Sequence, residues 1–261
     1  MSTTVPGAAL DDEQLRQYEG DGFLIVRGVF SSDEMMALER EASALWWRKD
    51  LIDTKNIRCR WQDNVESGEC TFECFDPVID LGPVAAQMAR DPRIVEPLAS
   101  IYGSPAHLFK DKLIFKPPGV RGYALHQDYI GWKSFPRTFI TVLLAIDAAG
   151  EDNGATEVFP GYHREGYLSP EDGMYHEVPL EKIDESRGVK LDLRPGDIAM
   201  FGAFTPHRSA PNRSDRWRRQ LYLSYNADDD GGDQRLAHYR EFHAWLRERY
   251  AEYDKSDTYF K

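Results

Sequence analysis

Hydrophobic and polar positions follow different patterns in the two parts of the chain. About the first hundred residues have a mainly helical pattern, interrupted by one strand-like run. The elements predicted there are helices at residues 12–19, 31 to about 48 and 84–102, and a strand at 22–29. Glu34 stands three residues after Ser31, which is the spacing of a capping box and marks the start of the second helix. The polar stretch 56–76 follows neither pattern.

From residue 107 onward the pattern changes to short alternating or apolar runs, separated by Gly, Pro and Asn. These runs predict strands at residues 108–116, 124–129, 137–146, 155–160, 188–193, 197–201 and 218–225. Runs of this length and spacing are typical of a closed or two-sheet β architecture. A last helix is expected over residues 234–250.

The order of the elements indicates one domain over residues 1–261, because no linker separates the helical part from the strands. We expect a mainly helical N-terminal part with a lid at residues 1–106, a β core at 107–226 and a C-terminal helix within 227–261. The 41% of hydrophobic residues, with 12% aromatic, exclude a disordered chain.

Charge and composition exclude several classes of partner. Lys and Arg number 32 against 44 Asp and Glu, which gives a net charge of −12 and makes nucleic acid and anionic membranes poor partners. We find neither a signal-peptide pattern nor the roughly 18 apolar residues of a spanning helix, so a cytoplasmic location is expected. We predict that Cys59, Cys70 and Cys74 are free thiols, buried as small hydrophobic side chains.

His126 and Asp128 form a candidate metal-binding pair. In an extended segment the side chains at positions i and i+2 leave on the same face, so these two can converge on one point. An imidazole beside a carboxylate suits a borderline metal such as Fe(II), but two ligands do not hold such an ion. His207 is our candidate for the third ligand, although with seven histidines in the chain a coincidence is the alternative.

Arg218 begins the strand-like run 218–225, eleven residues beyond His207. Alternation along this run puts Arg218 and every second residue after it on one face. An arginine on the inner face offers a planar fork that matches a carboxylate in two-point contact. The alternative is a solvated basic cluster made by the arginines at 216, 218 and 219.

This ordered set of residues resembles the phytanoyl-CoA dioxygenase family of Fe(II)/2-oxoglutarate-dependent oxygenases. The resemblance rests on His126-x-Asp128, His207 and Arg218, and on the segments YEGDGFLIVRGVFSSDEM (18–35), NGAT (153–156), VFPGYH (158–163) and RPGD (194–197). It implies a mainly β fold with flanking helices, a double-stranded β-helix or cupin-like jelly roll. It also implies that His126, Asp128 and His207 hold the iron, whereas His163 is structural.

The resemblance further implies Fe(II), 2-oxoglutarate and O₂ as cofactor and cosubstrates. Arg218 would bind the distal carboxylate of 2-oxoglutarate, and Lys112, Thr141 and Gln127 are our further candidates for that site. Substrate hydroxylation would release succinate and CO₂. Because Asp128 is retained where related halogenases have a small residue, hydroxylation is favoured over halogenation.

The candidate substrate residues are basic or aromatic. They are Arg58, Arg60, Lys116, Tyr123, Tyr129 and Trp132. Alternation in the run before His126 puts Lys110, Lys112 and Lys116 on one face, which would suit an anion if that face is turned to the cavity and would otherwise be an ordinary wet surface. The two arginines lie in the stretch 56–76, which could cover the barrel mouth. The aromatic residues flank the metal motif, although aromatics at such positions are usually core.

We therefore expect a small-molecule substrate that is polar and anionic, either an amino acid or a phosphonate such as 2-aminoethylphosphonate. The run DKLIFKPP (111–118) is similar to the branch of the family that hydroxylates aminoalkylphosphonates. One alternative is a tailoring oxygenase that hydroxylates, desaturates or cyclises a larger natural product. A second is a non-catalytic jelly-roll binding module, which would need a fourth protein ligand on its ion. A third is a scaffold in which the His/Asp set is coincidental.

Overall fold

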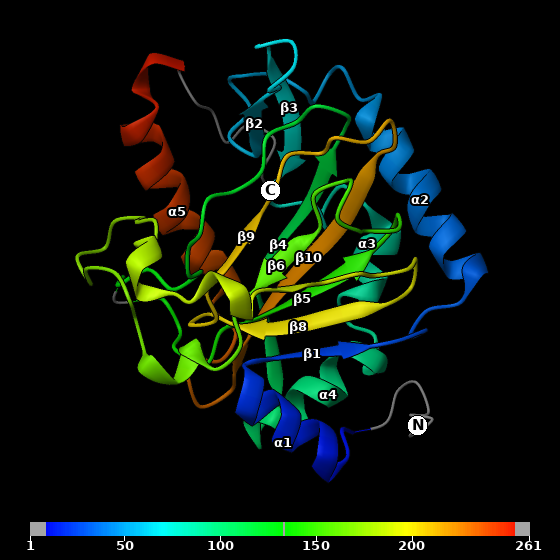
Figure 1. Ribbon diagram of the computed structural model, residues 1–261. Coiled ribbons are helices and arrows are strands. Elements are labelled where there is room, and N and C mark those ends of the chain that lie inside the picture. The colour runs from blue at the N-terminus through cyan, green and yellow to red at the C-terminus, as the bar shows by residue number, and fades with distance from the viewer. Residues whose placement is uncertain (1–8, 133, 254–261) are drawn as a thin grey trace.

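Two antiparallel sheets form the centre of the computed structural model, which describes residues 9–132 and 134–253 (Figure 1). The large sheet has seven strands in the order β1-β8-β5-β10-β4-β3-β2, and the small sheet has the order β7-β6-β9. The strands of the large sheet are β1 Phe23–Val26, β2 Cys59–Asp63, β3 Cys70–Phe75, β4 Ala106–Lys116, β5 Ile140–Ala145, β8 Ile198–Gly202 and β10 Arg218–Ala227. Those of the small sheet are β6 Thr156–Val158, β7 Val189–Lys190 and β9 His207–Ser209.

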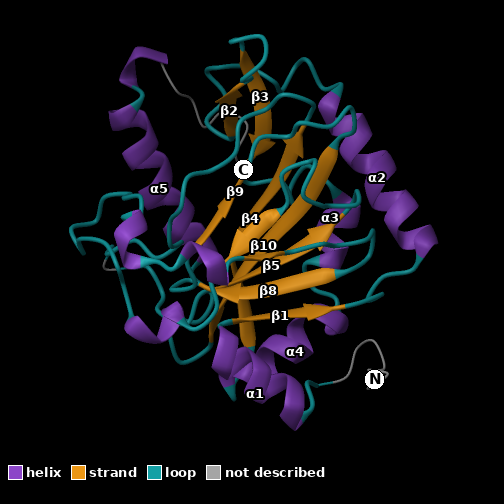
Figure 2. Cartoon of the chain, viewed as in Figure 1, coloured by secondary structure: helices purple, strands orange, loops and turns teal. Residues whose placement is uncertain are grey.

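The helices lie outside the sheets (Figure 2). Their bounds are α1 Asp12–Asp21, α2 Ser32–Trp46, α3 Pro83–Met88, α4 Pro92–Tyr102 and α5 Arg235–Arg249, with 3-10 turns η1 Tyr162–Glu165, η2 Leu180–Lys182, η3 Glu185–Arg187 and η4 Ala251–Tyr253. Apolar residues of α2, α3 and α4 share one buried cluster with the outer face of the large sheet. Among the described residues, no helix combines the length and the apolar character needed to cross a membrane.

Local sequence signals account for most of these helices. The capping box at Ser31 and Glu34 is present at the start of α2, where the two residues bond each other reciprocally. The helix predicted at 84–102 is instead two helices, because Asp91 caps a new helix with Pro92 in its first turn. The final helix is confirmed as α5.

Six of the seven predicted strand runs contain strands of the structure. The exception is residues 124–129, where the prediction is wrong: the backbone there makes only a single bridge, between His126 and His207, instead of a ladder. The unassigned stretch 56–76 contains β2 and β3, and β3 pairs with β4 through Cys74 and Ile114. Its role as a lid stays a prediction.

Alternation in β10 separates the outer core from the interior between the sheets. Leu221, Leu223 and Tyr225 pack on the helices, whereas Tyr222 belongs to the cluster that joins the two sheets. The face predicted for Arg218 is therefore confirmed as the inner one. This architecture agrees with the expected jelly roll. The cysteines are free, as predicted. Cys59 and Cys74 are buried, but the predicted burial of Cys70 is wrong, because this residue lies at the exposed start of β3.

Candidate metal centre

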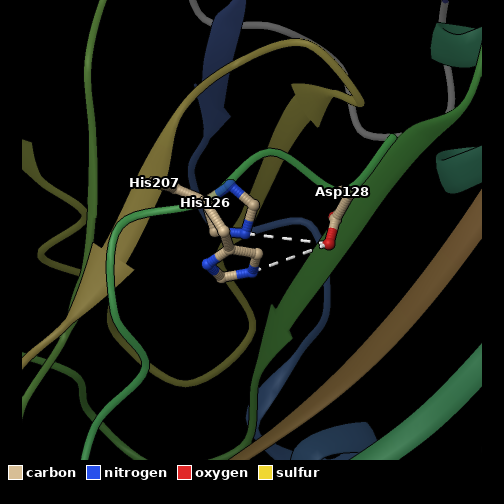
Figure 3. A group of neighbouring side chains, drawn as sticks. All are labelled: His126, Asp128 and His207. Carbon is tan, nitrogen blue, oxygen red and sulfur yellow. Dashed lines mark ion pairs between the residues drawn. The ribbon is translucent and has the colours of Figure 1, made fainter. Parts of the chain in front are cut away.

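Three side chains, from two segments that are distant in the sequence, point toward one another in Figure 3. His126 and Asp128 lie in the connection between β4 and β5, and His207 is the first residue of β9. Nε2 of His126 and Nε2 of His207 each lie 3.9 Å from Oδ1 of Asp128. One possible ligand atom from each residue lies within 4.8 Å of the others.

The backbone brings the two segments together. His126 and His207 each donate their amide N–H to the other's carbonyl oxygen at 2.9 Å. Gly122, near the start of the same connection, allows close approach to β9, because a Cβ at this position would lie 1.7 Å from the carbonyl oxygen of Ser209. The bridge between the histidines is the one place at which residues 124–129 pair as a strand would.

Hydrogen bonds to the second ring nitrogen fix both imidazoles. Nδ1 of His126 lies 2.7 Å from the carbonyl oxygen of Ala124, and Nδ1 of His207 lies 3.0 Å from that of Thr205. Since a carbonyl oxygen only accepts, Nδ1 carries the proton in each ring. Nε2 of each ring then keeps a free lone pair 3.9 Å from Oδ1 of Asp128, and a ring nitrogen held in this form is typical of histidines that bind metals.

Electrostatics keep Asp128 and His126 in metal-binding forms. Burial alone would raise the pKa of Asp128, but His207, Lys112 and His126 outweigh it and hold the pKa at about 2. Burial, and then the neighbouring His207, lower the pKa of His126 to about 3. At neutral pH a charged carboxylate therefore faces a neutral imidazole of His126, and these are the forms that bind metal ions.

The dimensions of this group suit one ion. Atoms spaced in this way lie within about 2.5 Å of a common point, close to the roughly 2.0–2.2 Å of ordinary metal–nitrogen and metal–oxygen bonds. Two imidazoles and one carboxylate are the donor set typical of non-haem Fe(II). No fourth His, Cys, Asp or Glu joins the group in the part of the chain that the structure describes. Such a donor set leaves room for other ligands, unlike a closed structural site.

Thr141, which we predicted at the cosubstrate site, lies against the metal candidates, and its role toward the cosubstrate stays a prediction. Its hydroxyl donates to Oδ2 of Asp128 at 3.1 Å and lies 3.1 Å from the hydroxyl of Ser224. Both hydroxyls are buried on neighbouring strands, β5 and β10. This contact fixes the orientation of the carboxylate, so that Oδ1 faces the two imidazoles.

The buried environment of Arg218 suits the binding of an anion. Its side chain is buried, with 1% of its surface exposed, and its Nε and Nη1 atoms have no hydrogen-bond partner among the described residues. A buried guanidinium without partners is costly, and two of its N–H groups fit one carboxylate. The residue thus suits the distal carboxylate of 2-oxoglutarate, and that assignment stays a prediction.

Glu73, on β3, is a buried carboxylate that the sequence analysis missed. The hydroxyl of Tyr123 donates to its Oε2 at 2.6 Å, whereas Oε1 has no partner in the described chain. Burial raises the pKa of Glu73 to about 7, although Tyr123, Lys116 and Arg218 act in the opposite direction. Glu73 is therefore the acidic neighbour of the two basic side chains at this end of the interior.

The other two predicted cosubstrate residues differ in their surroundings. Lys112 lies with its ammonium 4.9 Å from the ring centroid of Tyr222, and no described residue accepts a hydrogen bond from it. Burial disfavours its charge, but Asp128 outweighs this and raises the pKa of Lys112. Gln127 instead binds the carbonyl oxygens of Gly166 and Phe204 through its side-chain amide, which ties neighbouring loops together.

A cavity of about 480 Å³ opens beside His126 and Asp128. Of the predicted substrate residues, Tyr123 and Trp132 line it. Trp132 is held by a hydrogen bond from Nε1 to the carbonyl oxygen of Gly173, at 2.8 Å. A larger hollow of about 860 Å³ lies between α4 and the start of α5, and it contains none of the predicted site residues.

The other four predicted substrate residues do not line the cavity beside His126 and Asp128. Arg58 is fully buried, with two hydrogen bonds of 2.8 Å to Asp80, so its charge is used within the fold. Arg60 donates to the carbonyl oxygens of Ile57 and Cys59. Both arginines therefore use their polar side chains in hydrogen bonds within the fold, which stabilise the segment around β2.

Lys116 and Tyr129 also have partners elsewhere in the fold. The ammonium of Lys116 donates to the carbonyl oxygen of Ala210 and to the hydroxyl of Ser209. Tyr129 is buried, and its hydroxyl donates to Glu171 at 2.8 Å. The cavity is lined by Lys110 on β4, which the sequence analysis placed on a face that would suit an anion if turned to the cavity. It is also lined by residues of α5 that the sequence analysis did not consider for the site, His238, Phe242 and Trp245.

Comparison with known proteins gives a consistent result. The model of the phytanoyl-CoA dioxygenase family matches residues 18–220. The chain is 29% identical over 235 residues to a 2-aminoethylphosphonate dioxygenase from the uncultured bacterium HF130_AEPn_1, an alignment that covers 88% of this chain and 86% of the relative. It is 34% identical over 168 residues to a methylphosphonate hydroxylase from Gimesia maris, covering 64% of this chain and 62% of that protein.

The fold is similar to that of EctD from S. alaskensis, crystallised with 2-oxoglutarate and 5-hydroxyectoine. The TM-score is 0.73 at 22% sequence identity, over 88% of this chain and 80% of the other. At this level of identity the likeness concerns the fold, and it supports the jelly-roll assignment.

Proposed function

The chain belongs to the phytanoyl-CoA dioxygenase family, and from this premise we propose that it hydroxylates a carbon–hydrogen bond of a small phosphonate. It is an Fe(II)- and 2-oxoglutarate-dependent dioxygenase, with O₂ as the oxidant. In the proposed reaction one oxygen atom of O₂ enters the substrate as a hydroxyl group. The other enters 2-oxoglutarate, which leaves as succinate and CO₂.

Different residues of the chain would perform different parts of this reaction. His126, Asp128 and His207 would hold the iron, which when bound supplies the activation of O₂. Thr141 keeps the carboxylate of Asp128 turned toward the imidazoles. Arg218 would anchor the distal carboxylate of 2-oxoglutarate in a buried site, where a charge-assisted hydrogen bond gains strength from the exclusion of water.

The charge of the cavity beside the triad carries the proposal of an anionic substrate. Its lining includes two basic side chains close to the triad, Lys110 and Lys112, whereas Arg121 and Arg249 are exposed at the rim, where water screens their charge. Apart from Asp128, its only carboxylate among the described residues is Glu177. In a chain with a net charge of −12, such a lining is opposite in sign to the whole molecule. An anion is the ligand that this lining favours.

The names of two relatives narrow the class of anion. One is a 2-aminoethylphosphonate dioxygenase and the other a methylphosphonate hydroxylase. EctD, whose fold is similar, was crystallised with 2-oxoglutarate and, separately, with Fe. The names of the two phosphonate-acting relatives support a phosphonate as substrate, in preference to an amino acid or a larger natural product.

The test is a succinate-release assay of the Fe(II)-loaded protein with 2-oxoglutarate under air. The substrates are 2-aminoethylphosphonate, methylphosphonate and 3-aminopropanoate, which carries a carboxylate where the first has a phosphonate. We expect phosphonate-dependent succinate, together with a product heavier by one oxygen atom. Succinate formation that is equal with and without every phosphonate, while another substrate stimulates it, would refute the proposal.

A further inference from the structure

His238 is a buried imidazole with no hydrogen bond from its ring. It lies on α5 with 2% of its surface exposed, and neither Nδ1 nor Nε2 has a partner in the described part of the chain. Its ring lies parallel to that of Phe242 within 11°, with centroids 5.6 Å apart. Since buried polar atoms in native proteins are nearly always paired, these two nitrogens need an explanation. Both His238 and Phe242 line the cavity beside the triad.

The side chain of Lys110, on β4, lies beside the same Phe242 ring. Its ammonium lies 4.3 Å from the ring centroid of Phe242 and 3.2 Å from Oδ2 of Asp76. Asp76 is itself held by the hydroxyl of Tyr239, which donates to Oδ1 at 3.1 Å. The lysine is thus fixed in position by a buried carboxylate that α5 holds in turn.

The charges around Lys110 do not balance. Lys112 is next to it on the same face of β4, and the guanidinium of Arg60 lies 3.7 Å from Asp76 and 5.2 Å from the ring of Phe242. Three basic groups therefore face two carboxylates, Asp76 and Asp128, on this side of the cavity. Burial and the charge of Lys110 lower the pKa of His238 to about 3, so this imidazole stays neutral. A neutral imidazole still offers one N–H group to an acceptor.

The register of the strands places this group level with the metal candidates. Lys110 is opposite Ser224 on β10, and Ser224 is opposite Thr141 on β5, which donates to Asp128. Two strand spacings separate the backbones of Lys110 and Thr141, which is about 10 Å. A small molecule whose head group is bound at Lys110 therefore extends toward the triad with its next carbon atoms.

The chemistry of the donors favours a tetrahedral oxyanion. The fork of an arginine matches carboxylate and phosphate oxygens alike, whereas a lysine acts as a point charge, and in that form it is a common binder of phosphate-like groups. A phosphonate presents several oxygens in different directions, which an ammonium and a separate imidazole N–H can share. On this basis, and resting on the proposed function, we propose that Lys110 and His238, against the face of Phe242, bind the phosphonate group of the substrate.

Two variants and a matched control test this site. Lys110→Met removes the ammonium but keeps an unbranched side chain, and His238→Phe keeps the aromatic packing but removes both nitrogens. Arg121→Met is the control, because Arg121 lines the same cavity but its side chain is 57% exposed at the rim. The measurement is equilibrium binding of 2-aminoethylphosphonate and 3-aminopropanoate to the anaerobic Fe(II)- and 2-oxoglutarate-loaded protein.

We expect Lys110→Met to weaken phosphonate binding at least tenfold and His238→Phe to weaken it several-fold. Binding of 3-aminopropanoate should change less, and the affinity for 2-oxoglutarate should not change. Because replacing unpaired buried polar atoms by an apolar ring removes a desolvation cost, His238→Phe should keep or raise the melting temperature. A residue needed only for packing would not weaken ligand binding while preserving stability. Arg121→Met should bind phosphonate within about twofold of the parent, since a screened rim charge contributes little.

The inference is overturned if Lys110→Met and His238→Phe bind the phosphonate as tightly as the parent, or if Arg121→Met loses as much affinity as they do. Binding of inorganic phosphate to the same loaded protein separates this result from a failure of the proposed function. If no phosphonate is turned over but Lys110→Met still abolishes phosphate binding, the site stands and the proposed reaction does not. If the parent binds neither phosphate nor phosphonate, the site itself is refuted.

Discussion

Thr141 donates a hydrogen bond from its hydroxyl to Oδ2 of Asp128, at 3.1 Å, while Oδ1 of the same carboxylate faces both imidazoles. The two residues lie on different elements, one on β5 and the other in the connection before it. The contact gives Thr141 the role of orienting a metal ligand.

We expect Thr141→Val to lower the affinity for Fe(II) by about 10- to 100-fold, which is the usual loss when such a supporting hydrogen bond is removed. Valine has nearly the shape of threonine, so the melting temperature of the metal-free protein should change little. Thr141→Ser, which keeps the hydroxyl, should restore most of the affinity. Metal titration monitored by equilibrium dialysis decides the matter, and unchanged affinity in Thr141→Val would contradict the role.

Removal of a metal candidate should abolish both iron binding and turnover. We expect His207→Ala and Asp128→Ala to hold no stoichiometric iron and to release succinate at least 100-fold more slowly than the parent. His163→Ala is the control, since its Nε2 lies 3.2 Å from the carbonyl oxygen of Glu19, outside the triad. Iron content and succinate release are the two readouts. Normal turnover by both triad variants would exclude the metal assignment.

Replacement of Arg218 should affect the cosubstrate and leave the metal in place. We expect Arg218→Met to weaken 2-oxoglutarate binding by about 10- to 100-fold, the effect of losing hydrogen bonds between charged groups. Arg218→Lys should recover only part of this loss, because an ammonium cannot reproduce two-point contact. Two constants are measured for each variant and for the parent. The KM for 2-oxoglutarate should rise, whereas the Kd for Fe(II) should not change. A parent-like KM in Arg218→Met would remove this residue from the cosubstrate site.

Glu73 should make stability depend on pH. Its pKa is about 7 in the folded protein, through burial, against an ordinary value of 4.5. Between these values the native state binds more protons than the unfolded state, so its contribution to stability falls as pH rises from about 4.5 to 7. Glu73→Gln removes this loss and should raise the melting temperature relative to the parent by several degrees at pH 8, but by less at pH 5.

The control for Glu73→Gln is Glu177→Gln, since Glu177 is an exposed carboxylate of the same cavity. Thermal unfolding of the three proteins without 2-oxoglutarate, from pH 5 to pH 8, gives the comparison. A constant difference between Glu73→Gln and the parent across this range would show that Glu73 is ionised at every pH tested.

Local signals in the sequence predict the elements of this fold well. The capping residues at Ser31 and the alternation in β10 depend on neighbours within a few positions, and both are found in the structure. The break before Pro92 was visible as well, since Asp91 and Pro92 form a helix start within the run predicted as one helix. The prediction of a strand at 124–129 failed because only His126 pairs with a strand, at His207 of β9, whereas Leu125 and Tyr129 bond to residues in loops.

Residues that act through contacts between distant elements were harder to assign. Arg58 and Arg60 looked like substrate residues because they are charged, but their partners within the fold are not visible in a local pattern. His238, Phe242 and Trp245 recur at helical spacing and so mark one face of the final helix, which was a signal available in the sequence. That this face meets Lys110 follows only from how α5 packs beside β4.

The paired amides of His126 and His207 have a consequence for how the protein acquires its metal. Two main-chain hydrogen bonds already join the segments that carry all three donors, so the chain does not rely on an ion to bring them together. In a small zinc finger, by contrast, the metal supplies the free energy of folding itself. This protein instead has a metal site that is preorganised by its own fold. A chelator should therefore remove the metal without unfolding the protein, and added iron should bind again at the same site.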